Sequence, residues 1–175
     1  VQEQVEKALA RILGHKTAVL SSSRTDSGVH AEGMVAHFKT GSRLRDTSLR
    51  NALNFYLPRD IVVRHVRTEE PGFHARYHAR SKIYRYAIWN HPVRPLFEAP
   101  FALWHPRPLD VRRMARAAKY FLGRKDFSAF RDQTGDVQKS AVREIYRLRV
   151  KRSGPKITLE IEANGFLTHM VRHIA

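Results

Sequence analysis

Two neighbouring stretches in the C-terminal part of the chain alternate between apolar and polar residues, and this pattern constrains the fold more than any other. The stretches span residues 142–150 and 157–163, and Ser-Gly-Pro occupies residues 153–155 between them. A period of two is typical of β-strands, and glycine and proline favour a turn. The sequence therefore predicts a β-hairpin. Residues 83–89 alternate in the same way, so we expect a mainly antiparallel sheet.

Other segments carry apolar residues at helical spacing. The predicted helices span residues 1–13, 47–57, 109–122 and 166–174. Their ends carry the expected punctuation, because Gly14 and Gly123 follow the first and third helices and Pro58 stops the second. Shorter apolar runs predict further strands at residues 17–20, 34–38 and 61–63.

Each half of the chain thus combines helices with strands. The sequence predicts an α/β (α+β) fold in which two similar lobes surround a shared, mainly antiparallel sheet with helices on one side. Five prolines punctuate the segment of residues 92–108, which therefore reads as a Pro-rich linker. We expect an N-terminal lobe of residues 1–91, which carries the loop described below, and a C-terminal lobe of residues 109–175.

The charge of the chain restricts its partners. Among 175 residues, 32 are Lys or Arg and 16 are Asp or Glu, which gives a formal net charge of +16. Such an excess attracts polyanions, so nucleic acid is the expected partner. An anionic membrane is the alternative polyanion. The sequence has no basic amphipathic helix with a large apolar face and no apolar run of transmembrane length, so we expect no membrane partner.

The chain contains no cysteine. Disulfides, thiol nucleophiles and Cys-based zinc sites are therefore excluded. This composition is typical of an intracellular, reducing compartment, and it does not distinguish cytoplasm, nucleus and mitochondrion.

One loop concentrates chemical groups. Residues 21–31 (SSSRTDSGVHA) lie between the predicted strands of residues 17–20 and 34–38, so they should form a tight loop at a sheet end. Asp26 lies two residues from Arg24, and Gly28 lets the backbone fold back sharply. An ordinary Asx-type turn, in which Asp26 accepts backbone N–H groups, explains the same residues from local chemistry alone.

Other chemistries find less support. His74 and His78 have i, i+4 spacing, but the helical context and the adjacent glutamate of a zinc helix are missing, so we expect polar or RNA-facing histidines and no metal. Ser27 and His30 lack a nucleophile-elbow pattern and an identifiable third member. Gly-rich phosphate loops are absent. A carboxylate in a basic protein remains, with strand aromatics such as Tyr84 that could stack on an extruded base.

The sequence resembles the TruA-type pseudouridine synthases in five ordered segments. Residues 24–31 resemble the family's active-site motif Arg-Thr-Asp-Ala-Gly-Val-His-Ala, and residues 57–61 its Leu-Pro-x-Asp-Ile helix exit. The other three segments are residues 73–86 (FHAR followed by YRY), 126–131 (DFSAFR) and 164–172 (NGFLTHMVR). No single match is specific, but five matches in order are.

The resemblance implies roles for named residues. Asp26 would be the catalytic aspartate that attacks the uridine nucleotide. Tyr84 would stack on the target uracil and contribute to proton transfer, and Arg172 would be the cation paired with Asp26. Arg24 would help to extrude the nucleotide and hold its phosphate. The further RNA-binding residues expected in a basic cleft are His30, Arg76, Arg80 and Arg85.

The resemblance also implies a reaction. The family breaks the glycosidic bond of a uridine, turns the uracil and rejoins it through carbon 5 without a cofactor. Whether the aspartate adds to the sugar, adds to the ring or assists elimination to a glycal stays open at this point. Transfer RNA is the implied substrate, with ribosomal and messenger RNA as alternatives. A homodimer or association with a ribonucleoprotein are the assemblies to consider.

The sequence departs from the family pattern in four places. Ser27 replaces an alanine, and Ser23 stands where a glycine often precedes the motif; both are small, so we expect the loop to be retained. The family's first strand, with its Tyr-Asp-Gly-Thr pattern, and the segment after Met-Val-Arg are not in the sequence. We therefore expect this chain to be part of a longer protein. The alternative function is a catalytically idle, synthase-like RNA-binding module or ribonucleoprotein component.

Overall fold

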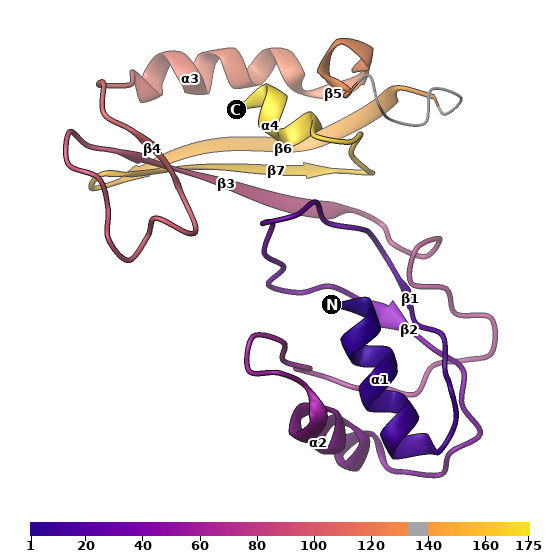
Figure 1. Cartoon of the computed structure of the whole chain (residues 1–175). Coiled ribbons are helices and arrows are strands. Elements are labelled where there is room, and N and C mark those ends of the chain that lie inside the picture. The colour runs from indigo at the N-terminus through magenta and orange to yellow at the C-terminus, as the bar shows by residue number, and fades with distance from the viewer. Residues whose placement is uncertain (133–139) are drawn as a thin grey trace. The chain divides into compact units, whose positions relative to one another are not determined.

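The computed structural model describes residues 1–132 and 140–175, and it mixes helices and strands as the sequence predicts (Figure 1). The chain forms two compact units, unit 1 of Val1–Ala79 and unit 2 of Arg80–Ala175. The described strands form a two-stranded sheet in unit 1 and a five-stranded sheet in unit 2. The α/β (α+β) class is confirmed, but these strands do not share one sheet, because no ladder joins the two sets.

Two helices dominate unit 1. Helix α1 (Gln2–Leu13) ends where predicted, because Gly14 takes a left-handed conformation with φ of 76° and its N–H donates to the carbonyl of Ala10. Helix α2 (Asp46–Tyr56) ends one residue before Leu57, whose extended backbone precedes Pro58. Local periodicity and punctuation are thus sufficient to place both helices.

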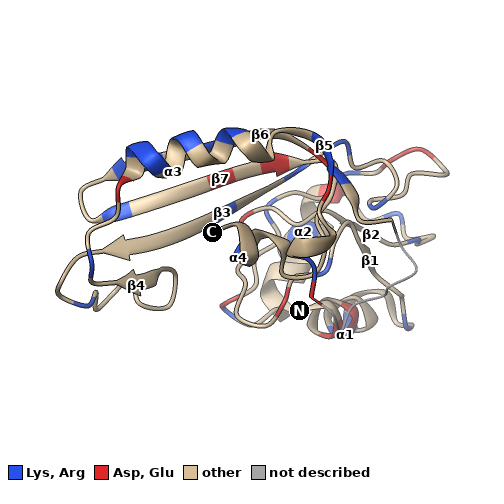
Figure 2. Ribbon diagram, turned by 90° about the horizontal axis from the view of Figure 1, so that it is seen from above, with Lys and Arg blue, Asp and Glu red and all other residues tan. Residues whose placement is uncertain are grey.

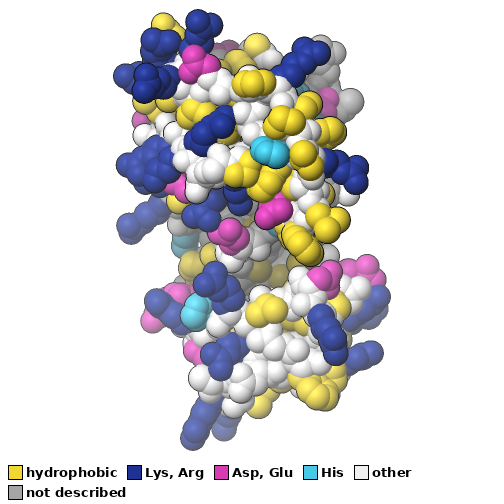
Figure 3. Space-filling model, turned by 90° about the vertical axis from the view of Figure 1, so that its left-hand side faces the viewer, with side chains coloured by type: hydrophobic (Ala, Val, Ile, Leu, Met, Phe, Trp, Pro, Cys, Tyr) yellow, Lys and Arg dark blue, Asp and Glu magenta, His cyan; other side chains and the backbone are white. Residues whose placement is uncertain are grey.

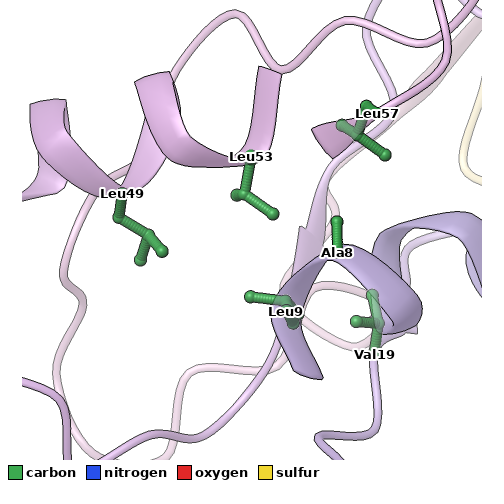
Figure 4. Packing of buried hydrophobic residues seen from close by; sticks show 6 residues of the cluster. All are labelled: Ala8, Leu9, Val19, Leu49, Leu53 and Leu57. Carbon is green, nitrogen blue, oxygen red and sulfur yellow. The ribbon is translucent and has the colours of Figure 1, made fainter. Parts of the chain in front are cut away.

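The core of unit 1 lies between these helices. Leu49 and Leu53 of α2 point toward Ala8 and Leu9 of α1, and Val19 closes the same cluster (Figure 4). All of these side chains are buried. Replacing a leucine of such a cluster by alanine typically lowers the free energy of unfolding by about 2–5 kcal/mol.

The strands of unit 1 are shorter than predicted. β1 (Leu20–Ser21) and β2 (Ala36–His37) form a two-stranded antiparallel sheet, with Leu20 opposite His37. The predicted strand at residues 61–63 is wrong. The side chain of Asn54 takes the place of a neighbouring strand, because its Oδ1 accepts from the N–H of Val63 at 2.7 Å and its Nδ2 donates to the Val63 carbonyl at 2.9 Å.

Unit 2 is built on one sheet with the order β4-β3-β7-β6-β5. Its strands are β3 (Lys82–Asn90), β4 (Leu103–His105), β5 (Gly123–Asp126), β6 (Val142–Ser153) and β7 (Lys156–Ala163). The predicted β6–β7 hairpin is confirmed, and Gly154 in its turn has φ of 57°. All pairs are antiparallel except β3 with β4.

Helices cover one face of this sheet (Figure 1). They are α3 (Val111–Ala118), the 3₁₀ turns Lys119–Phe121 and Ser128–Phe130, and α4 (Met170–Ile174). On β7 the alternate residues Ile157, Leu159, Ile161 and Ala163 are buried beneath them. The residues between them face the other side, where Glu160 pairs with Arg85 and Arg147, and Glu162 pairs with Arg147.

Helix α3 is shorter than the predicted 109–122. Asp110 caps it by accepting from the N–H of Arg113 at 3.0 Å, and the chain passes into a 3₁₀ turn after Ala118. Figure 2 shows Lys and Arg recurring along this helix, and Arg112, Arg113 and Arg116 are exposed. The last predicted helix is also shorter, since only Met170–Ile174 of residues 166–174 is helical.

The boundary between the units differs from the expected linker at 92–108. β3 pairs along its length with β7 and so belongs to unit 2, which begins at Arg80. Buried Asn90 ties down the Pro-rich segment: its Nδ2 donates to the carbonyls of His105 and Arg107, and its Oδ1 accepts from the N–H of Leu109. The prolines therefore mark a fixed connection that contains β4.

Candidate functional site

Asp26 begins a tight turn at the end of the two-stranded sheet. The N–H of Ser22 donates to the carbonyl of Val35 at 2.8 Å and extends the β1–β2 ladder toward the loop. The carbonyl of Asp26 accepts from the N–H of Val29 at 3.1 Å, and Gly28 has φ of 78°, the sign that a type II turn requires at its third position. The Asp26 side chain is half-buried, whereas Arg24 is exposed.

Serine side chains form hydrogen bonds in the N-terminal part of the Asp26 loop. Ser21 Oγ donates to the carbonyl of Ser23 at 2.7 Å, and Ser23 Oγ lies 3.4 Å from the carbonyl of Arg24. Directly after the loop, Arg64 Nη1 donates to the carbonyl of Glu32 at 3.1 Å. Ser23, which departs from the family pattern, thus contributes to the loop's own hydrogen bonding.

His74, expected to be a polar or RNA-facing histidine, makes hydrogen bonds within its own turn. Its half-buried ring lies 4.2 Å from the Tyr77 ring and 4.7 Å from the His37 ring, centroid to centroid. Its Nδ1 accepts from the N–H groups of Arg76 and Tyr77. Partial burial, and then the neighbouring His37 and His78, lower the pKa of His74, so the neutral ring is favoured as an acceptor.

The turn built on His74 presents basic residues. Arg76 is exposed, as are His30 in the Asp26 loop and Arg80 at the start of unit 2. Figure 3 shows Lys and Arg side chains projecting over much of the face that it depicts. Phosphate groups are the natural ligands of such exposed cations.

Tyr84 lies on the helix-covered face of β3. It pairs with Ile161 of β7, and its half-buried ring meets the ring of Phe166 at 4.9 Å between centroids and 75° between planes. Tyr86, two residues on, faces the same core. The alternation of the sequence predicts this shared face; Phe166 as the neighbour of Tyr84 was not predicted, since only its place in the matched segment 164–172 singles it out.

Arg172 is exposed on α4, which packs against β3. Met170 and Val171 anchor this helix in the same cluster that Tyr84 joins. The structure therefore brings Tyr84, Phe166 and the helix of Arg172 together within unit 2. Asp26 belongs to unit 1, with Arg24, His30 and Arg76.

Arg85 lies on the opposite face of β3 from Tyr84. Its Nε donates to Oε2 of Glu160 at 3.0 Å, and Arg147 bridges Glu160 and Glu162 at 3.3 and 3.2 Å. The hydrogen bond from Arg85, and then the charge of Arg147, hold the pKa of Glu160 below its usual value. RNA binding by Arg85 stays a prediction, and the strand's alternation places this side chain on the face opposite Tyr84.

Two further findings concern the described residues alone. Among residues 1–132 and 140–175, no three His, Asp or Glu residues gather in a way that could hold a metal ion. The longest helix of these ranges has 12 residues, so none is long and apolar enough to cross a membrane.

Comparisons with known proteins point to the same family as the sequence motifs. The family model described as "tRNA pseudouridine synthase" matches residues 117–175, a range that contains Arg172 and not Asp26. A protein named tRNA pseudouridine synthase A from Coxiella burnetii is 41% identical over 175 residues, which cover 100% of this chain and 67% of the relative.

Relatives of the same name extend the comparison. The one from Methylococcus capsulatus is 43% identical over 175 residues, covering 100% of this chain and 64% of its own length. The one from Salmonella paratyphi B is 41% identical over 174 residues, covering 99% of this chain and 64% of its own length. The chain thus spans about two thirds of the length of these relatives.

Proposed function

Because the chain belongs to the tRNA pseudouridine synthase family, we propose that it isomerises uridine to pseudouridine in transfer RNA and that Asp26 is the catalytic nucleophile. The observation that carries this proposal is the turn at Asp26. It presents a half-buried carboxylate in a loop whose backbone is held on both sides by hydrogen bonds. A carboxylate held in this way can act as a nucleophile on a bound nucleotide.

The reaction leaves the atomic composition of the nucleotide unchanged. The bond between C1′ and N1 breaks, a bond between C1′ and C5 forms, the proton leaves C5 and a proton is gained at N1. Attack by Asp26 would form a transient bond to the electrophilic carbon of the nucleotide while the uracil turns. The step consumes no oxidant, reductant or phosphate donor, so this chemistry asks only for a nucleophile, a proton acceptor and a pocket for the base.

Tyr84 and Arg172 have the chemistry for the supporting roles. The Tyr84 ring is half-buried against Phe166, which gives a fixed aromatic face for stacking on an extruded uracil. Its hydroxyl can take part in moving the C5 proton. Arg172 supplies a permanent cation that would pair with the carboxylate of Asp26.

The charge of the chain supports RNA as the substrate. A formal charge of +16 provides the sequence-independent attraction that phosphate backbones require. Arg24 is exposed beside the Asp26 turn, and Arg76 and Arg80 are exposed on and just after the His74 turn. These arginines would bind phosphates, and Arg24 would assist extrusion of the target nucleotide.

The test replaces Asp26 by asparagine, which keeps the side-chain size and removes the nucleophile. Turnover is followed by the release of tritium from tRNA labelled at C5 of uridine, because that hydrogen must leave. We expect kcat to fall by at least ~10³-fold while RNA affinity stays within ~3-fold. Glu70→Gln removes an exposed carboxylate outside the loop and should leave both unchanged.

Equal turnover by Asp26→Asn and the unsubstituted protein would refute the assignment of Asp26. The RNA-binding module makes a different prediction. If the unsubstituted protein binds tRNA in a salt-sensitive manner and releases no tritium, the module is the better description.

A further inference from the structure

Asp132 and His169 form a polar pair in unit 2. Nδ1 of His169 lies 2.8 Å from Oδ2 of Asp132, and the two side chains are 32% and 29% exposed. An ionised carboxylate only accepts hydrogen bonds, so Nδ1 carries the proton and donates it. The N–H of Asp132 also donates to the carbonyl of Thr168 at 3.3 Å. Two bonds therefore join Asp132 to the two residues that precede α4.

His169 has the backbone conformation that starts this helix. Its φ of 58° makes it the sole non-glycine residue with positive φ in the described part of the chain. Such a conformation persists only where the surroundings hold it, although histidine tolerates it better than most residues. The carbonyl of His169 accepts from the N–H of Arg172 at 2.9 Å and from that of His173 at 3.1 Å. The residue held by Asp132 thus directly fixes the backbone of Arg172.

Helix α4 depends on such anchors because it has only five residues. A single turn of helix is unstable by itself in water. Met170 and Val171 bury one side of it. On another side, His173 Nδ1 donates to the carbonyl of Phe130 at 3.0 Å, and the rings of His169 and His173 meet edge-on at 6.4 Å. The two imidazoles tie the helix to residues 130–132 and fix its rotation.

We infer that Asp132 and His169 are positioning residues for Arg172. The inference rests on the proposed function, in which Arg172 is the cation paired with the nucleophile. Asp132 acts through the side chain of His169, and His169 acts through its backbone, so neither needs to touch RNA. The pair orients the guanidinium before substrate binds, and pre-organised charge stabilises a transition state more than it stabilises the bound substrate.

The kinetic test uses three substitutions of the pair. Asp132→Ala removes the acceptor and should lower kcat ~10-fold while KM changes less than ~2-fold, because a misplaced group costs rate more than binding. Asp132→Asn retains an oxygen that accepts from Nδ1 and should keep kcat within ~3-fold. His169→Gly keeps the positive φ without the imidazole and should match Asp132→Ala. Glu70→Ala controls for the loss of one carboxylate.

The variant Arg172→Ala separates this inference from the proposed function. If Arg172→Ala retains turnover, the role of Arg172 in the proposed function is wrong. If Arg172→Ala loses turnover and Asp132→Ala keeps it, only the positioning inference is overturned. Asp132→Ala combined with Arg172→Ala should be no slower than Arg172→Ala alone, and additive losses would overturn the inference.

A readout without turnover completes the test. The order parameter of the Arg172 Nε–H group, measured by NMR relaxation, should fall in Asp132→Ala and His169→Gly and stay high in Asp132→Asn. An unchanged order parameter in all three variants would overturn the inference. Circular dichroism melting shows whether a variant is unfolded. If Asp132→Ala is unfolded, the comparison of Asp132→Asn with His169→Gly decides whether the inference holds.

Discussion

The rings of Tyr84 and Phe166 meet in an edge-to-face arrangement, with centroids 4.9 Å apart and planes inclined by 75°. Edge-to-face pairs of this kind contribute about 0.5–1.5 kcal/mol beyond the area that they bury. The contact joins β3 to the segment that leads into α4. Phe166 is therefore a structural support for the residue proposed to stack on uracil.

Replacing Phe166 by alanine should show whether its contact with Tyr84 matters for catalysis or only for the stability of the fold. We expect the free energy of unfolding to fall by about 1–3 kcal/mol, less than for a fully buried phenylalanine, and kcat to fall by roughly 10-fold because Tyr84 loses its neighbour. Phe121→Ala is the matched control, since Phe121 packs in the same cluster but against Phe130. It should lose similar stability and keep its kcat. Urea unfolding and tritium release measure the two quantities, and equal kcat in both variants would count against the support role.

Gly28→Ala tests the turn at Asp26. A Cβ there meets nothing within 4 Å, so the cost comes from the backbone φ of 78°, about 1 kcal/mol. Gly14→Ala imposes the same strain at the end of α1, where φ is 76°. Both variants should lose similar stability in urea unfolding, but only Gly28→Ala should lower kcat. Gly33→Ala, just after the loop at an ordinary φ and in open space, should change neither, and reduced turnover there would show that this segment tolerates no added methyl group.

The salt dependence of RNA binding tests Arg76 and Arg80. If each neutralises one phosphate, Arg76→Ala and Arg80→Ala should each reduce the slope of log K against log salt by about 0.7–0.9. Fluorescence anisotropy with labelled tRNA between ~50 and ~200 mM KCl, the range over which such slopes are resolved, provides the measurement. Arg112→Ala, on the solvent side of α3, gives the comparison for an exposed arginine outside the predicted set. Slopes identical to that of the unsubstituted protein would remove both residues from the RNA-binding surface.

Arg85→Ala should raise the pKa of Glu160 toward its ordinary value, because the hydrogen bond from Arg85 is the largest cause of the lowered pKa. A carboxyl group with a lowered pKa in the folded state stabilises the protein above its unfolded-state pKa, and this contribution is lost as the pH falls through the folded-state pKa. The variant should therefore show a smaller loss of stability on acidification through that window. Carbon NMR titration of the Glu160 carboxyl measures the pKa directly, with Arg112→Ala as the control; an unmoved pKa in Arg85→Ala would contradict the assigned cause.

Much of the fold follows from local sequence signals. The β6–β7 hairpin, β3 and helices α1 and α2 were predicted because periodicity and turn residues act over short distances. The strand predicted at residues 61–63 failed because the side chain of Asn54 satisfies Val63, an arrangement that no apolar pattern reveals. The unit boundary at Ala79 was missed because it depends on the pairing of β3 with β7, which lies far along the chain.

The candidate site likewise has features that the sequence predicts and features that it does not. The turn at Asp26 follows from glycine placement, and strand alternation puts Tyr84 and Tyr86 on one face of β3. The Phe166 contact, the anchoring by Asp132 and His169 and the engagement of Arg85 by Glu160 join residues from separate elements. Such contacts depend on how separate elements pack in the folded chain. No single segment of the sequence reveals this packing.

Strand β7 has a consequence for how the chain can change its length. Its buried and half-buried residues alternate strictly, with Ile157, Ile161 and Ala163 fully buried and Glu160 and Glu162 on the charged face. Deleting or inserting one residue would move these glutamates beneath the helices and expel the isoleucines. A change of length at the turn of residues 154–155 would leave the alternation within β7 intact, so lineages should tolerate such changes there better than within β7.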